Sequence, residues 1–194
     1  MTFNHEHLNQ QKIVITGGPS TGKTSLINTL EKNGYYCFHE VIRLMTLEAK
    51  ENGELSNLST NPIATVSDPM NFNKKIINAR LADYKRAAQI IDPIVFFDRG
   101  IPDVLAYMDF FEQTYEKEFL DIAKENRYDA IFLLPIWKEI FVSDNERFES
   151  YTEALSIHHY LKKTYTALGY DVIEVPKDSI ENRIRFILNR LEAY

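Results

Sequence analysis

The fold is decided by the stretch Lys12-Ile13-Val14-Ile15-Thr16-Gly17-Gly18-Pro19-Ser20-Thr21-Gly22-Lys23-Thr24-Ser25, in which an apolar run precedes the pattern Gly-x-x-x-x-Gly-Lys-Thr. Residues 13–16 have the composition of a buried strand, and residues 23–33 favour a helix. Gly17 and Gly22 allow backbone conformations that a Cβ would obstruct, so successive N–H groups of the loop can turn toward one anion. The stretch therefore predicts a strand, a phosphate-binding loop and a helix whose N-terminus points at the same anion.

The glycine spacing and the Lys-Thr pair together form the pattern of a P-loop. In this pattern Lys23 is expected to reach the β- and γ-phosphates of a nucleotide, and the Thr24 hydroxyl is expected to hold Mg²⁺. The alternative, a glycine-rich turn that binds nothing, is disfavoured by the strand before it and the helix after it. The residues expected to bind the nucleotide are Gly17, Gly18, Pro19, Ser20, Thr21, Gly22, Lys23, Thr24 and Ser25.

Composition narrows the class of protein. A chain of 194 residues with 44% apolar residues is consistent with one globular domain, residues 1–194. The net charge is −6, from 22 Lys and Arg against 28 Asp and Glu, which gives no electrostatic sign of nucleic-acid binding. No apolar stretch approaches the length of a membrane span, and the first residues do not have the pattern of a signal peptide. We therefore expect a cytoplasmic protein.

Strand-like and helix-like segments alternate along the chain, which predicts an α/β fold with a five-stranded parallel sheet and helices on both faces. The expected strands are residues 13–16, 35–39, 94–97, 130–134 and 171–175. The expected helices are residues 23–33, 40–50, 71–91, 102–111, 115–126, 151–168 and 179–191. Two segments, about 51–68 and 137–150, are expected to form a small lid or binding insert. Ligands of such folds sit at the carboxyl ends of the strands.

Charged residues follow two of the expected strands. Glu40 comes directly after the second, and a carboxylate there can accept a proton from a hydroxyl that attacks a γ-phosphate. The alternative is an acidic residue in the first turn of a helix, where the dipole favours it. Asp98 closes the third strand, which is the Walker B arrangement in which a carboxylate acts on Mg²⁺. Arg99 can clamp a phosphate or orient Glu40.

The segment 137–150 offers a third candidate. In phosphoryl transfer, a segment carrying an arginine can close over the phosphates and stabilise the transition state. Arg147 is the residue chosen for that role, and a solvated arginine in an acidic loop is the alternative. Asp103 is interpreted as a helix residue that could also face the cleft.

The chain resembles the NadR-like family of small P-loop proteins, which is related to nucleoside and nucleotide kinases. The resemblance rests on residues 17–24, on His39-Glu40-Val41-Ile42-Arg43, on Phe97-Asp98-Arg99-Gly100, and on the runs 146–150 and 170–176. It implies a three-layer P-loop NTPase fold, ATP with Mg²⁺, and phosphorylation of a nucleoside-like hydroxyl.

Deoxynucleoside kinases are similar in layout, with a strand-end Glu as base and an Asp/Glu-Arg-Ser motif. This chain departs in two ways. Gly100 replaces the Ser, and the lid segment carries one Arg, Arg147, and one Lys, Lys138.

Two functions are compatible with these patterns. The first is a kinase in which Lys23 and Arg147 neutralise the γ-phosphoryl group, Thr24 and Asp98 hold Mg²⁺, and Glu40 takes the proton. Its acceptor would lie near Arg43, Arg80 and Arg99, and the adenine near residues 175–178. The second is a nucleotide-dependent regulatory module without small-molecule transfer. A switch GTPase is disfavoured, because the chain lacks the Asn/Thr-Lys-x-Asp motif.

Overall fold

The computed structural model describes residues 10–42, 68–141 and 150–192. The strands are β1 (Gln11–Gly17), β2 (Tyr36–Phe38), β3 (Ile94–Asp98), β4 (Ala130–Leu134) and β5 (Val172–Glu174). The helices are α1 (Lys23–Lys32), α3 (Pro69–Ala87), α4 (Pro102–Phe110), α5 (Lys117–Glu125), the 3₁₀ turn η2 (Lys138–Ile140), α6 (Tyr151–Ala167) and α7 (Ile180–Glu192).

The five strands form one sheet in the order β2-β3-β1-β4-β5, and every pair is parallel. The central strand β1 pairs with β3 on one side, where Ile15 lies opposite Asp98, and with β4 on the other, where Gly17 lies opposite Leu134. The carboxyl ends of these three strands therefore lie at one edge of the sheet, which is where the predicted site residues fall. The predicted α/β fold with a five-stranded parallel sheet is confirmed.

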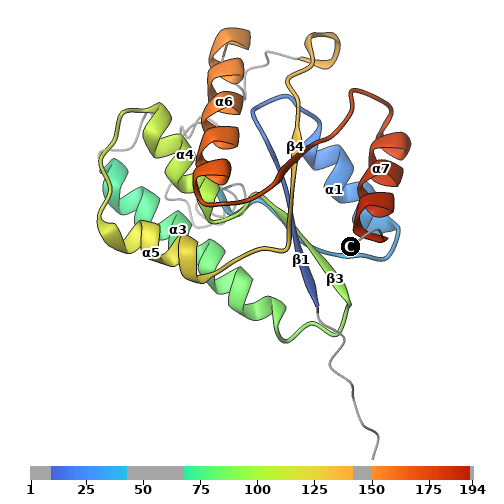
Figure 1. Ribbon diagram of the computed structural model, residues 1–194, viewed down its shortest axis with the longest axis horizontal. Helices are drawn as coiled ribbons and strands as arrows, with labels where there is room; N and C mark the ends of the chain where they lie inside the picture. The colour runs from blue at the N-terminus through green and yellow to red at the C-terminus, as the bar shows by residue number, and fades with distance from the viewer. Residues whose placement is uncertain (1–9, 43–67, 142–149, 193–194) are drawn as a thin grey trace, which may run out of the picture.

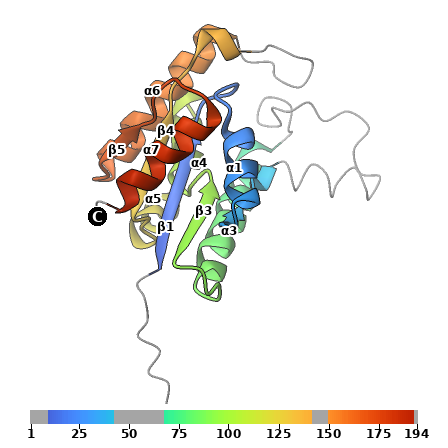
Figure 2. The same ribbon diagram turned by 90° about the vertical axis from the view of Figure 1, so that its right-hand side faces the viewer.

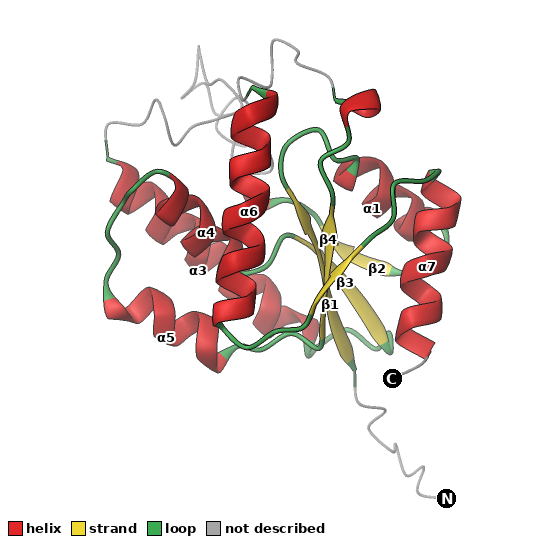
Figure 3. Ribbon diagram, turned by 45° about the horizontal axis from the view of Figure 1, so that its top comes forward, coloured by secondary structure: helices red, strands yellow, loops and turns green. Residues whose placement is uncertain are grey.

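The sheet separates two apolar layers, so the domain has three layers (Figure 1). On one face Ile13 and Ile15 of β1 pack with residues of α1 and α7, and Figure 2 looks onto this face. On the other face Val14 packs with residues of α3, α4, α5 and α6. Alternate residues of β1 thus point to opposite faces, as the period of a strand requires, and Figure 3 shows the strands between the two sets of helices.

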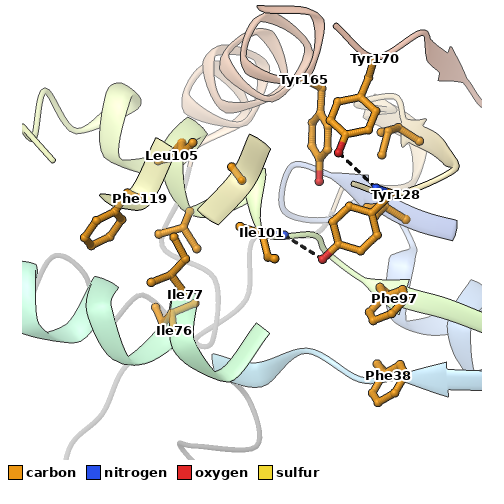
Figure 4. Close-up of a cluster of buried hydrophobic side chains, with 14 of the residues drawn as sticks. Phe38, Ile76, Ile77, Phe97, Ile101, Leu105, Phe119, Tyr128, Tyr165 and Tyr170 are labelled. Atoms are coloured by element: carbon orange, nitrogen blue, oxygen red, sulfur yellow. Dashed lines mark hydrogen bonds between the residues drawn. The ribbon is translucent and has the colours of Figure 1, made fainter. Parts of the chain in front are cut away.

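An aromatic cluster fills the larger layer near the end of β3 (Figure 4). Phe38 and Phe97 stack with their ring centroids 4.8 Å apart. The buried Tyr128 hydroxyl accepts a hydrogen bond from Ile101 N–H, and Tyr170 accepts one from Tyr128 N–H. These polar tips are satisfied inside an apolar layer, which fixes the loop after β3 against the core.

The helix ends predicted from glycines and capping residues lie close to the observed ends for most helices. Gly34 and Gly169 follow α1 and α6 with φ of 93° and 80°, the left-handed conformation that ends a helix. The helix predicted to begin at residue 71 begins at Pro69, because Asp68 caps it by accepting a hydrogen bond from Asn71 N–H. Of the helix expected over residues 40–50, only its first residues are described. None of the described helices is long and apolar enough to span a bilayer.

Candidate active site

The loop between β1 and α1 has the backbone of an anion cradle. Ser20 and Gly22 adopt left-handed conformations, with φ of 57° and 83°, within a tight turn. A turn that contains left-handed residues points successive backbone N–H groups to the same side. Gly17, with φ of 152°, also has no room for a side chain, because a Cβ there would lie 2.8 Å from the Leu134 carbonyl oxygen of β4. The first glycine is thus required both by the turn and by the close approach of the neighbouring strand.

The Lys23 side chain folds back onto the loop and is hydrogen-bonded to its backbone. Its Nζ donates hydrogen bonds to the carbonyl oxygens of Gly17 and Gly18, at 2.8 and 2.7 Å. Burial and, after it, the nearby charge of Arg99 lower the pKa of the Lys23 ammonium to about 7, against the opposing effect of Asp98. A negatively charged ligand in the loop would favour the protonated form of Lys23.

Asp98, the last residue of β3, has a buried carboxylate that suits a bound cation. It is buried, and its Oδ1 atom has no hydrogen-bond partner among the described residues. Burial raises its pKa to about 6, and the charge of Glu40 acts in the same direction. An unpartnered buried carboxylate oxygen is costly alone but suits a cation or its bound water. Asp98 therefore fits the Mg²⁺ that the P-loop pattern implies.

Arg99, which follows β3, and Glu40, which follows β2, form an ion pair. Arg99 Nε donates to Glu40 Oε1 at 2.6 Å, and Arg99 is itself buried. Burial alone would raise the pKa of Glu40, but the charges of Arg99 and Lys23 outweigh it and hold the pKa below its ordinary value. Glu40 is thus ionised at neutral pH, with one oxygen fixed by Arg99.

The backbone of Arg99 stores strain. Its φ is 74°, which is unfavourable for a bulky residue. The conformation is held by hydrogen bonds from Arg99 N–H to the Ile15 carbonyl oxygen and from Arg99 Nη1 to the Gly17 carbonyl oxygen. Arg99 thereby ties the end of β3 to the start of the phosphate-binding loop, an arrangement typical of functional sites.

Asp103 lies in the first turn of α4, as the sequence predicted, and its contacts are those of a buried anion. It is completely buried and accepts four hydrogen bonds: Oδ1 from Thr16 Oγ1 at 2.6 Å and Arg99 Nη1 at 3.1 Å, and Oδ2 from Gly100 N–H at 2.9 Å and the Tyr165 hydroxyl at 2.6 Å. Burial opposes ionisation, but the cations Arg80 and Arg99 and these hydrogen bonds hold its pKa below the ordinary value. Asp103 is a buried anion that connects β1, the Arg99 turn and α6.

The same network explains why Gly100 stands where the similar motif has Ser. A Cβ at position 100 would lie 2.5 Å from the Tyr165 hydroxyl oxygen and 3.1 Å from both Tyr128 Cε2 and Val14 Cγ2. Real Cβ atoms essentially never come so close to other atoms as the first of these distances. The space that a Ser side chain would need is thus occupied by the tyrosine that bonds Asp103.

Four of the five predicted catalytic residues lie together: Lys23, Glu40, Asp98 and Arg99. Arg80 joins them from α3, because its Nη1 donates to the Gly100 carbonyl oxygen at 2.7 Å while its buried Nε has no partner among the described residues. Thr24 and Ser25 occupy the first turn of α1, where Thr24 is partly buried and Ser25 exposed.

Two predicted residues have no structural test. Arg147 and Arg43 lie outside the described residues, as does most of the segment 51–68. Of the segment 137–150, residues 137–141 and 150 are described, and Ser150 begins α6 with a capping box that includes Glu153. The role of Arg147 therefore stays a prediction.

Comparison with solved structures gives the same fold. The deoxyadenosine kinase from M. mycoides superposes with a TM-score of 0.66 at 15% identity, over 95% of this chain and 100% of that chain. The NadR protein in complex with NR gives 0.71 at 19% identity, over 96% of this chain and 52% of that one. The thymidylate kinase from Ehrlichia chaffeensis gives 0.63 at 12% identity, over 94% and 99%. At such identities the likeness establishes the fold, a three-layer α/β P-loop fold.

Comparison with sequences gives the family. A search among curated proteins finds no match. The model of one protein family, described as AAA domain, matches residues 12–183, from the first strand to the last helix. This match covers most of the chain and includes every predicted site residue. The chain therefore belongs to the AAA domain family of P-loop proteins.

Proposed function

We propose that this protein is a Mg²⁺- and ATP-dependent kinase that transfers the γ-phosphate to a hydroxyl of a small nucleoside-like acceptor. The observation that carries the proposal is the Arg99–Glu40 pair, 2.6 Å between Nε and Oε1, at the strand end next to the phosphate-binding loop. A buried carboxylate that is held in one orientation is suited to take the proton of an attacking hydroxyl. A small cavity lies beside Arg99, lined among others by Phe38, Arg80 and Asp98.

The chemical step uses Glu40 as the proton acceptor. The acceptor hydroxyl oxygen attacks the γ-phosphorus, the bond from that phosphorus to the β,γ-bridging oxygen breaks, and ADP leaves with the bond's electrons. The hydroxyl proton passes to Glu40, which is ionised at neutral pH because Arg99 and Lys23 lower its pKa. Arg99 holds Oε1 by a hydrogen bond, which leaves the second carboxylate oxygen, Oε2, as the proposed proton acceptor.

The remaining residues neutralise charge. Lys23 exchanges its loop carbonyls for phosphate oxygens, and Arg147 is proposed to approach the γ-phosphoryl group from the segment 142–149. Thr24 and Asp98 would hold Mg²⁺, which when bound neutralises charge on the β- and γ-phosphates. The unpartnered Asp98 Oδ1 supports this assignment.

The class of acceptor is proposed from the site and from its structural relatives. The Nε atom of Arg80 is buried and unpartnered beside the cavity, so it can donate a hydrogen bond to a polar acceptor group. Arg43 and Arg99 would contribute further donors. Two similar structures are those of a deoxyadenosine kinase and of NadR in complex with NR, which supports a nucleoside-like acceptor. The adenine of ATP is proposed to lie near residues 175–178.

The test is release of ADP from Mg·ATP in the presence of nucleosides, nicotinamide riboside and nucleoside monophosphates, each supplied separately. The proposal predicts stimulation by one class of acceptor and its loss in the variant Lys23→Ala. A rate near zero with every compound, while ATP still binds, would refute the kinase and favour a nucleotide-dependent regulatory module.

A further inference from the structure

Arg183, on α7, lies against the outer side of the phosphate-binding loop. Its Nη2 donates to the Thr21 carbonyl oxygen at 2.9 Å, across 162 positions of sequence. Its Nη1 lies 3.1 Å from the place that a Cβ on Gly22 would occupy. Helix α7 packs beside α1, so the last helix of the fold reaches the loop that precedes α1 (Figure 1). No sequence pattern marks Arg183 for this position.

The Arg183 guanidinium is buried, and no counter-ion for it lies among the residues that the structure describes. Only 2% of the residue is exposed, and its Nε has no hydrogen-bond partner among the described residues. No acidic side chain of the described ranges forms an ion pair with it, and burial alone lowers its pKa. Buried charges in proteins are ordinarily paired, because an unpaired one is expensive to desolvate. Within the described part of the chain, the positive charge of Arg183 is therefore not balanced by a neighbouring carboxylate.

The hydrogen bond to Thr21 also fixes the direction of a donor. In a trans peptide unit the C=O and the following N–H point to opposite sides. Arg183 holds the Thr21 carbonyl outward, so the N–H of Gly22 in the same unit points away from Arg183. This is the side to which a nest of successive N–H groups turns toward an anion. Arg183 therefore orients one of the donors of the phosphate-binding loop.

We propose that Arg183 is a positioning residue of the nucleotide site, and that the nucleotide's polyphosphate serves as its counter-ion. It acts through the Thr21–Gly22 peptide, which it orients, and through its charge, which acts across the loop. The inference rests on nucleotide binding by the proposed kinase and not on phosphate transfer. It assigns to α7 a role in phosphate affinity, in addition to its packing against the sheet.

The test compares Arg183→Gln with Arg185→Gln, which removes the same charge from an exposed position of the same helix. Binding is measured by displacement of a fluorescent ATP analogue with ATP, ADP, AMP and inorganic tripolyphosphate. We expect Arg183→Gln to raise the Kd roughly tenfold for tripolyphosphate, ATP and ADP and much less for AMP, which has no β-phosphate. Arg183→Lys, which keeps the charge, should recover part of the affinity, and Arg185→Gln should bind as wild type.

A role confined to packing would lower thermal stability without this dependence on phosphate number. The inference is overturned if a folded Arg183→Gln variant binds tripolyphosphate like wild type, or if all four ligands weaken equally. Should the Gln variant not fold, the Arg183 Nε–H resonance of the wild-type protein decides, because saturation with tripolyphosphate must shift it. Failure of wild type itself to bind ATP would instead refute the proposed function.

Discussion

Replacing Gly100 by Ser restores the residue found in the similar kinase motif, yet the structure predicts that this change destabilises the protein. The new Cβ would lie 2.5 Å from the Tyr165 hydroxyl oxygen and 3.1 Å from atoms of Tyr128 and Val14. All three neighbours are buried, so none can move into solvent. Overpacking of this kind costs about 1–3 kcal/mol of unfolding free energy.

The nearest obstacle is the tyrosine hydroxyl, so removing it should relieve part of the cost. Tyr165→Phe alone loses a hydrogen bond to the buried Asp103 carboxylate, worth about 1.5–3 kcal/mol. If Gly100→Ser costs about 2 kcal/mol by itself, it should cost less than about 1 kcal/mol in the Tyr165→Phe background, a coupling of at least 1 kcal/mol.

Urea unfolding of the wild type, the two single variants and the double variant measures this coupling. Gly100→Ala serves as the control, because it adds the Cβ without the hydroxyl and should cost as much as Ser. A Gly100→Ser protein within about 0.5 kcal/mol of wild type, a typical surface effect, would show that the turn relaxes freely. Equal cost in both Tyr165 backgrounds would show that the hydroxyl is not the obstacle.

Three further predictions concern charge in the site. Glu40→Gln should lower the rate of phosphate transfer by roughly 10²–10⁴-fold, which is the usual contribution of a general base. The ATP affinity measured by calorimetry should stay nearly unchanged. If ATP binding were lost together with transfer, Glu40 would not be the base. Asp103→Asn should lower the unfolding free energy in urea by about 3 kcal/mol, since it discharges a buried acceptor bonded to Arg99, and a loss under 1 kcal/mol would contradict that assignment. The affinity for Mg·ATP should be greatest between about pH 6 and 7. Below about pH 6 the Asp98 carboxylate becomes protonated, and above about pH 7 Lys23 loses its proton. A Kd that does not change from pH 5 to 9 would contradict both pKa shifts.

The fold was predictable because its signals are local. The apolar run of β1, the glycine pattern after it and the alternation of strands with helices together predict a parallel sheet with the phosphate-binding loop at its carboxyl edge. Glu40 and Asp98 could also be recognised as candidate site residues from the sequence, because each is a charged residue at the end of an apolar, strand-like run. Their proximity then follows from the parallel topology.

The polar network behind the site was not predictable, since it depends on contacts between distant segments. Asp103 lies in the first turn of α4, where an acidic residue is ordinary. Only the packing of α6 against α4 brings the Tyr165 hydroxyl to it, 62 positions away in sequence. Arg183 is one of several arginines on an amphipathic helix, and its burial against the phosphate-binding loop appears only in three dimensions.

The central claim is that the γ-phosphate is transferred to an organic hydroxyl, and the fate of that phosphate tests it most directly. ATP labelled in the γ-position would be incubated with the protein, Mg²⁺ and the acceptor that most stimulates ADP release. The account predicts label in the acceptor, one per ADP formed, and none with Lys23→Ala or Glu40→Gln. Label recovered only as inorganic phosphate would contradict it and identify an ATPase.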